Sequence, residues 1–170
     1  MHDVKGPDGM DEMEERFAEL VGLYQTPLRR MCCVWLGDAA LAEDAVQETF
    51  LRAYRALPVF RGECSAKTWL CRIAVNVCRN MKRSWWWRHV DRAVEIDNLP
   101  EAGAAFATED DSLLQAVCAL PLRQREVILL YYYQDMNMAE IAKTLNTSVS
   151  TVSRRLDAAR KTLLRQLEGE

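Results

Sequence analysis

The sequence predicts an all-α protein with two small helical domains joined by an acidic, flexible linker. Apolar residues recur at spacings of three and four through most of the chain, strand-like alternation does not occur in it, and one acidic stretch breaks the helical pattern. A length of 170 residues suits one domain or two small ones. We assign a disordered N-terminal tail to 1–12, domains to 13–92 and 112–170, and the linker to 93–111.

The first domain is predicted to contain three helices. Apolar residues over 17–35 form one amphipathic face, which Pro27 interrupts and is expected to kink. Asp38, directly after a glycine, is the expected N-cap of the second helix, whose apolar stripe includes Phe50. A short loop then leads to Ser65, the expected N-cap of the third helix.

The second domain resumes the helical pattern after the linker. Pro121 stands at the start of an apolar helix. Asn137 and Glu140 form a capping-box-like start for the next helix. A turn over 146–148 precedes a long last helix, in which apolar residues over 149–167 follow one face.

Charge is segregated along the chain, although the net charge is only −3. Residues 1–51 carry a net charge of −7, and residues 52–92 carry a net charge of +8. The linker has six acidic and no basic side chains, and residues 112–170 carry a net charge of +2. The whole-chain value argues against nucleic-acid binding, whereas the two basic segments favour it.

Several classes of protein are excluded by what the sequence lacks. No apolar run approaches the roughly 20 residues that span a bilayer, and the acidic N-terminus has no secretory-signal pattern. We therefore expect a cytoplasmic protein without membrane insertion. No glycine-rich phosphate loop or Ser/His/Asp order is present, so we predict neither an enzyme nor a cofactor.

The six cysteines do not have metal-ligand spacing. No Cys-x-x-Cys pair occurs, and His2 and His89 are the only histidines, so no zinc site is predicted. Free, buried thiols are the expected state in a reducing compartment. The alternative is a redox switch through Cys71 and Cys78, which lie seven residues apart on one helical face.

The strongest functional signal lies at 137–160, where a short helix, a turn and a second helix form a helix-turn-helix pattern. The second helix starts with hydroxyl and guanidinium groups, as a helix that reads the major groove requires. Arginine can donate two hydrogen bonds to guanine, and serine or threonine can bond bases or phosphates. The candidate duplex-DNA contacts are Ser150, Thr151, Ser153, Arg154, Arg155, Arg160 and Lys161.

The second signal is the basic segment 52–92, in which basic side chains are interleaved with Phe60, Trp69 and three tryptophans at 85–87. Basic and aromatic side chains together suit single-stranded or distorted DNA; the alternative is a charged solvent face with aromatics in the core. Trp69 lies on the apolar stripe, so we expect it in the core. The three tryptophans could cap the core, meet the linker or contact a partner.

A third segment, DAVQETFLRAYR at 44–55, places acids and a glutamine near one another on a helix, which by itself is typical of a solvated surface. Taken together with FRGECSAKTWLCRIAVNVCRNMKR at 60–83 and the segment 120–167, it resembles the extracytoplasmic-function (ECF) group of sigma factors of bacterial RNA polymerase. The resemblance covers nearly the whole chain, in the family's order.

The resemblance implies an alternative sigma factor that binds core RNA polymerase and directs initiation at promoters with −10 and −35 elements. The first domain would be region 2, which captures an unpaired −10 base, and the second would be region 4, which reads the duplex −35 element. An anti-sigma factor would hold the protein inactive. The implied contacts to the β′ clamp helices are Asp44, Gln47, Glu48 and Phe50. The implied −10 contacts are Phe60, Arg61, Gly62, Glu63, Cys64, Ser65, Lys67, Asn76, Arg79 and Lys82.

Two other functions are compatible with the same motifs. A stand-alone transcriptional regulator would use the helix-turn-helix to bind a specific duplex site, with the N-terminal half as a sensing or dimerisation domain. An interaction module would sense redox state through Cys71 and Cys78. Specific initiation with core polymerase distinguishes the sigma factor from both.

Overall fold

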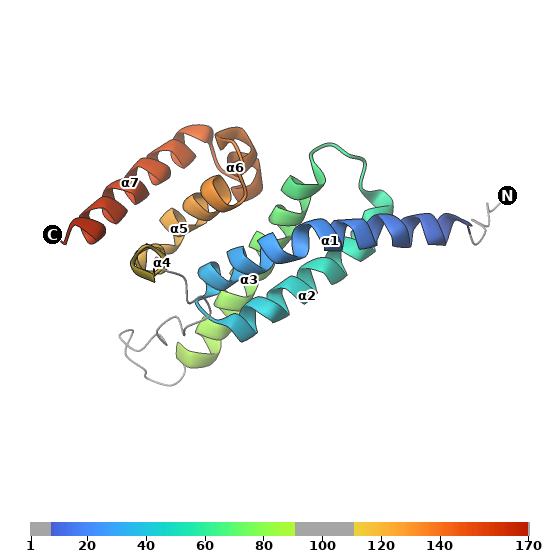
Figure 1. Cartoon of the computed structure of the whole chain (residues 1–170), viewed down its shortest axis with the longest axis horizontal. Helices are drawn as coiled ribbons and strands as arrows, with labels where there is room; N and C mark the ends of the chain where they lie inside the picture. Colours follow the sequence, from blue (N-terminus) through green and yellow to red (C-terminus); the bar gives the residue numbers. More distant parts are fainter. Residues whose placement is uncertain (1–7, 91–110, 170) are drawn as a thin grey trace.

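The structure, a computed structural model, describes residues 8–90 and 111–169, and every regular element within these ranges is a helix. This confirms the all-α prediction. The first domain contains α1 (Asp8–Leu36), α2 (Ala39–Ala56), the short 3-10 helix η1 (Leu57–Val59) and α3 (Ala66–Val90). The second contains α4 (Asp111–Ala119), α5 (Leu122–Ile128), the π-helical turn η2 (Leu129–Tyr133), α6 (Met138–Leu145) and α7 (Val149–Glu168) (Figure 1).

Helix α1 is longer than the sequence pattern predicted. Residues 8–12 of the expected disordered tail are helical, because Met13 packs against the core and extends the apolar face by a further turn. Residues 1–7 lie outside the described residues. Pro27 does not interrupt the helix: Leu28, Met31 and Trp35 beyond it are all fully buried, and this packing offsets the backbone hydrogen bond that proline removes.

The predicted caps of the first domain are present. Gly37 adopts φ +70°, a left-handed conformation that favours glycine and ends α1. The Asp38 carboxylate then accepts a hydrogen bond from the Leu41 amide at 2.8 Å. Ser65 Oγ accepts from the Thr68 amide at 3.1 Å at the start of α3. These contacts confirm the boundaries between the three helices of this domain.

The helix-turn-helix has the predicted local geometry. Asn137 and Glu140 form a reciprocal capping box, with the Glu140 amide donating to Asn137 Oδ1 at 3.0 Å and the Asn137 amide donating to Glu140 Oε2 at 2.9 Å. Asn146 ends α6 at φ +52°, and Ser148 caps α7 by accepting from the Thr151 amide at 3.2 Å. The turn is therefore fixed from both sides.

Loss of the capping box is expected to lower the free energy of unfolding. Asn137→Ala removes one acceptor at the start of α6, which costs about 1 kcal/mol, and urea unfolding followed by circular dichroism measures the change. Asn80→Ala is the matched control, because Asn80 is exposed within α3. An equal loss of stability in both variants would contradict the capping assignment.

The two domains pack against each other and share one hydrophobic core, in which residues of α1, α2 and α3 lie together with residues of α5, η2, α6 and α7 (Figure 1). Polar contacts cross the same boundary. The Arg125 guanidinium donates to the carbonyl of Trp35 at 3.0 Å, and Gln134 Nε2 donates to the carbonyl of Pro27 at 3.2 Å. The predicted linker lies outside the described residues apart from Asp111, which begins α4.

Candidate nucleic-acid interface

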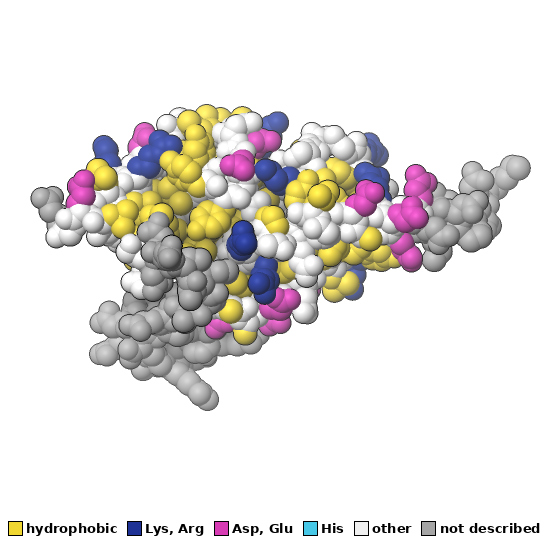
Figure 2. All heavy atoms as spheres, viewed as in Figure 1, with side chains coloured by type: hydrophobic (Ala, Val, Ile, Leu, Met, Phe, Trp, Pro, Cys, Tyr) yellow, Lys and Arg dark blue, Asp and Glu magenta, His cyan; other side chains and the backbone are white. Residues whose placement is uncertain are grey.

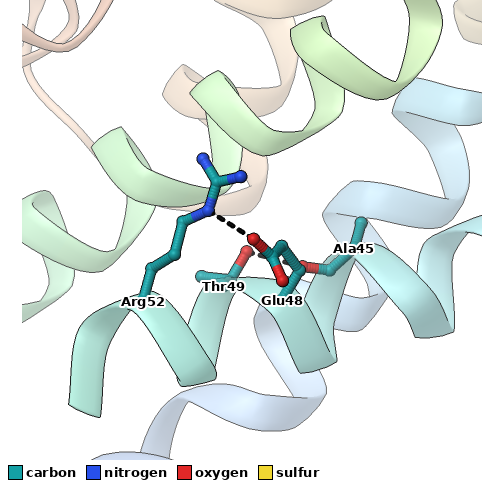
Figure 3. Close-up of polar contacts among 4 residues, drawn as sticks. All are labelled: Ala45, Glu48, Thr49 and Arg52. Carbon is teal, nitrogen blue, oxygen red and sulfur yellow. Dashed lines mark hydrogen bonds and ion pairs between the residues drawn. The ribbon is translucent and has the colours of Figure 1, made fainter. Parts of the chain in front are cut away.

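Helix α2 presents a polar face to solvent. Asp44 and Gln47 are exposed, and the half-exposed Glu48 forms a 2.6 Å ion pair with Arg52 one turn later (Figure 3). Phe50, the fourth residue expected on this surface, is instead only 8% exposed and packs edge-on against Phe17. The face thus consists of two acids and an amide, and Phe50 stabilises it from within the core.

The loop before α3 forms one wall of a cavity of about 470 Å³. Phe60 and Trp69 stack with their ring centroids 4.5 Å apart and their planes 19° from parallel. Trp69, expected in the core, is half-buried: it packs against the hydrophobic core and also lines this cavity, where its ring stacks on Phe60. Gly62 turns the loop at φ +73°, and Arg61 and Glu63 beside it are exposed. A cavity of this size and lining can accept a planar base.

Only some of the expected −10 contacts on and before α3 are open to solvent. Cys64 and Lys67 are half-buried, whereas Ser65 and Asn76 are exposed. The side chains of the tryptophans at 85–87 lie outside the described part of the chain, so the three alternatives for them stay open. The expected −10 contacts that are exposed to solvent therefore lie mainly in the loop before α3 and at Asn76.

Arg79 and Lys82 on α3 face the second domain. Arg79 donates two hydrogen bonds of 2.9 Å to the Glu126 carboxylate. The pKa of Lys82 is lowered, first by burial and then by the nearby Arg125. These two expected DNA contacts therefore lie at the boundary between the domains.

The start of α7 carries the expected cluster of hydroxyl and guanidinium groups. Ser150 and Arg154 are exposed, and Thr151, Ser153 and Arg155 are half-buried. Within the cluster, Thr151 lies 2.8 Å from the Ser148 hydroxyl and accepts a long 3.5 Å hydrogen bond from Arg154. The positive end of the helix dipole at this N-terminus adds to the attraction for phosphate.

Arg160 is held apart from the other arginines of α7. Its Nε donates to the Tyr132 hydroxyl at 3.1 Å, and its guanidinium lies 5.5 Å from the Tyr131 ring centroid. Lys161 beside it is exposed. The structure thus brings Arg154 and Arg155 to the start of α7 and directs Arg160 toward η2.

A second cavity, of about 310 Å³, lies between the domains. Arg79, Arg123 and Arg155 line it together with Glu126, so three positive charges surround one negative charge. The pKa of Arg155 is lowered, first by partial burial and next by the charge of Arg123. An anionic ligand such as a phosphate would relieve this repulsion.

The cysteines are free thiols in the structure. Cys78 Sγ lies 3.6 Å from Cys32 Sγ, so the thiol that contacts Cys78 comes from α1, and the alternative of a redox switch through Cys71 and Cys78 stays a prediction. Burial raises the pKa of Cys71 to about 12, which leaves little reactive thiolate. Among the described residues, no group of three or more Cys, His, Asp or Glu side chains could hold a metal ion.

Figure 2 shows acidic side chains near the beginning of α1 and hydrophobic ones gathered over α5 and α7. The exposed apolar residues in the second domain include Tyr132, Leu164 and Leu167.

Within the described ranges, none of the helices combines the length and the apolar character that a membrane span requires.

The sequence did not predict which side chains of the second domain contact the candidate DNA-binding surface of the first domain. Lys143 of α6 lines the cavity beside Phe60, and Glu126 of α5 binds Arg79. A single acid directly before the apolar run 127–133 was one available signal, because a charge there must find a partner when buried. Lys143 gave no such signal, since only the fold brings α6 next to the loop.

Comparison with known families matches both halves of the chain. The Sigma-70 region 2 family matches residues 20–88, and the Sigma-70 region 4 family matches residues 110–163. The two matches fall on α1–α3 and on α4–α7, and together they account for more than half of the chain.

Individual relatives agree with these matches. The chain is 30% identical over 168 residues to the ECF RNA polymerase sigma factor SigW of Bacillus subtilis, covering 91% of this chain and 90% of SigW. It is 33% identical over 135 residues to the ECF RNA polymerase sigma-E factor of Escherichia coli K12, covering 71% of this chain and 70% of that protein.

Solved structures share the fold. The sigma factor RpoE of Bartonella quintana, in complex with the anti-sigma factor NepR, aligns with a TM-score of 0.79 at 22% identity, over 91% of this chain and 98% of that one. CnrH, in complex with the cytosolic domain of CnrY, aligns with a TM-score of 0.67 at 24% identity, over 92% and 90%.

Proposed function

Because the chain belongs to the ECF sigma factors of bacterial RNA polymerase, we propose that the surfaces described above divide promoter recognition between them. The protein is an alternative sigma factor: it binds core polymerase and directs initiation through −10 and −35 elements, as a non-enzymatic initiation factor. The stand-alone regulator is not favoured, because its supposed sensing domain is region 2.

The polar face of α2 is the proposed docking surface for the β′ clamp helices. Asp44, Gln47 and Glu48 support this role, since they are the accessible members of the set and carry acidic groups on a helix fixed by the core. The Arg52 guanidinium lies 2.6 Å from Glu48 and partly neutralises its charge. An exposed ion pair of this kind contributes little stability, so a basic side chain of the polymerase can readily replace Arg52 beside Glu48.

The cavity beside Phe60 and Trp69 is the proposed site for an unpaired −10 base. It combines an aromatic stack with Arg61 and Arg72, which supply the charge that a nucleotide backbone requires. Extruding a base costs a few kcal/mol, which a fitted pocket offsets. Asn76, Arg79 and Lys82 then lie along α3 for the strand beyond the pocket.

The start of α7 is the proposed reader of the −35 duplex. Arg154 is exposed and Arg155 is half-buried, and both lie in the first two turns of the recognition helix. Arg160, which bonds Tyr132, supports η2 in this state, and Lys161 is placed to meet phosphate.

Removal of either arginine should change −35 selectivity. If the side chain donates two hydrogen bonds to a base, Arg154→Ala or Arg155→Ala should reduce discrimination at one position by roughly 1–3 kcal/mol. Transcription by the reconstituted holoenzyme from promoters with single −35 changes measures it. A uniform loss over all sequences would instead make the residue a phosphate contact.

Exchange of promoter elements tests whether region 2 recognises the −10 element and region 4 recognises the −35 element. Variants at Arg154 should respond to −35 changes and not to −10 changes, whereas variants at Phe60 should show the reverse. The observation that carries this proposal is that one chain combines an aromatic-lined cavity in region 2 with a capped helix-turn-helix in region 4. Equal responses of both variants to both elements would contradict it.

We further propose that an anti-sigma factor controls this protein in the cytoplasm, where core polymerase is found. Two solved proteins of the same fold are bound to such a regulator or to a cytosolic partner domain. The exposed apolar side chains of Tyr132, Leu164 and Leu167 support a protein partner on the second domain.

A further inference from the structure

One charged contact joins the two DNA-binding domains. Arg79 Nε and Nη2 donate to the two carboxylate oxygens of Glu126, both at 2.9 Å, across 47 positions of sequence. Glu126 is only 2% exposed. A buried carboxylate of this kind requires a cation, and a bidentate guanidinium is the geometry that satisfies both of its oxygens.

The same face of region 2 is covered by region 4 at further points. Thr68 Oγ1 donates to Glu140 Oε1 at 3.4 Å, and Lys143 lines the cavity of Phe60 and Trp69. Farther along α3, burial and the charge of Arg125 lower the pKa of Lys82. Contacts thus follow α3 from its first turn to Lys82, along the side that carries the proposed −10 contacts.

We propose that region 4 closes over the −10 face of region 2 in the free protein, with the Glu126 carboxylate occupying Arg79 in place of a DNA phosphate. Arg79 cannot bind both anions through the same two donors, so promoter binding and this closure exclude each other. The inference rests on the proposed role of Arg79 in −10 binding; the closure itself rests on the interdomain contacts alone.

The geometry also makes the closure reversible. Arg155 lines the same cavity as Glu126, and the Glu126 charge acts to raise the pKa of Arg155. When the domains separate, the carboxylate therefore has a second cation from its own domain and gains access to water. Opening then exposes Arg79 without leaving an unpaired buried charge.

The Glu126→Gln variant of the full-length protein tests this closure. Glutamine has nearly the same shape but no charge, so the closed state should be weakened. Small-angle X-ray scattering should show a larger radius of gyration. Binding of the free protein to a fork-junction DNA with an unpaired −10 strand, followed by fluorescence anisotropy, should tighten by at least about tenfold, the value of one hydrogen bond to a charged group.

Two further variants complete the test. Glu168→Gln makes the same chemical change at the exposed end of α7 and should alter neither measurement. Arg79→Gln should open the protein like Glu126→Gln, and the double variant should open it no further, because both changes remove one interaction. Circular dichroism establishes that each variant keeps its helices.

Three results would overturn the proposal. An unchanged radius in both Glu126→Gln and Arg79→Gln would show that the pair does not hold the domains together. Additive opening in the double variant would show that the two residues act independently. Opening of the Glu126→Gln variant, in which Arg79 is intact, without tighter fork-junction binding would show that closure does not oppose DNA. A separate experiment distinguishes failure of the sigma-factor assignment from failure of this closure: the wild-type protein with core polymerase would then give no promoter-specific transcription.

Discussion

Replacing Asp44 and Glu48 together with arginine is expected to abolish assembly with core RNA polymerase. The two acids lie one turn apart on α2, where Asp44 is exposed and Glu48 half-exposed, so the exchange reverses the charge of the docking surface without touching the core. Like charges placed across an interface cost several kcal/mol. Native gel electrophoresis or size-exclusion chromatography with core polymerase measures the loss.

A matched control separates the effect of the position on α2 from the effect of the change in net charge. Glu15→Arg with Glu19→Arg makes the same change in net charge on an exposed face of α1, also at a spacing of four residues. Its holoenzyme should form normally. Both double variants should unfold within about 0.5 kcal/mol of the wild type, as surface substitutions usually do. Assembly of the Asp44 and Glu48 variant at the wild-type level would show that α2 does not dock.

Trp69→Ala is expected to reduce open-complex formation by roughly 10–100-fold. The indole stacks on Phe60 and lines the cavity proposed for the −10 base. Stacking of one base on an aromatic side chain is worth about 1–3 kcal/mol, and each 1.4 kcal/mol is tenfold. Permanganate reactivity of unpaired promoter thymines measures the amount of open complex directly.

Trp69→Phe separates stacking from folding in this experiment. Phenylalanine retains a flat ring on the Phe60 side and should keep most of the activity. Both variants should bind core polymerase and discriminate −35 sequences like the wild type, because α2 and α7 are unchanged. If the alanine and phenylalanine variants open promoters equally well, Trp69 does not hold the base.

Local features of the fold were predictable because each depends on residues close together in sequence. The caps at Asp38, Ser65 and Asn137 and the turn over 146–148 all depend on side chains within three positions of the amides they bind. Phe50 is the instructive exception. Its place in the apolar stripe indicated burial, whereas the family resemblance assigned it to the docking surface; the structure agrees with the stripe.

The arrangement between domains was not predictable in the same way. Periodicity shows which face of a helix is apolar, but it does not name the helix that covers it. The family resemblance implied Arg79 as a −10 DNA contact, and nothing near it in sequence indicates that Glu126 binds it. The same holds for Lys143 beside the Phe60 cavity.

The segregated charge also has a structural counterpart. The basic segment 52–92 contributes Arg79 to the cavity between the domains, and the mildly basic second domain contributes Arg123 and Arg155. One buried acid, Glu126, lines the same cavity and binds Arg79. A net charge of −3 for the whole chain therefore coexists with a local excess of positive charge where the two DNA-binding domains meet.

Run-off transcription tests the central claim most directly. The purified protein is mixed with core RNA polymerase and a promoter library, and the start sites and DNA binding of the free protein are measured in parallel. Membership in the ECF sigma factors predicts initiation at a defined set of promoters sharing −10 and −35 elements, with weak DNA binding in the absence of core. Tight binding of the free protein to a duplex site, without specific initiation when core is added, would contradict it.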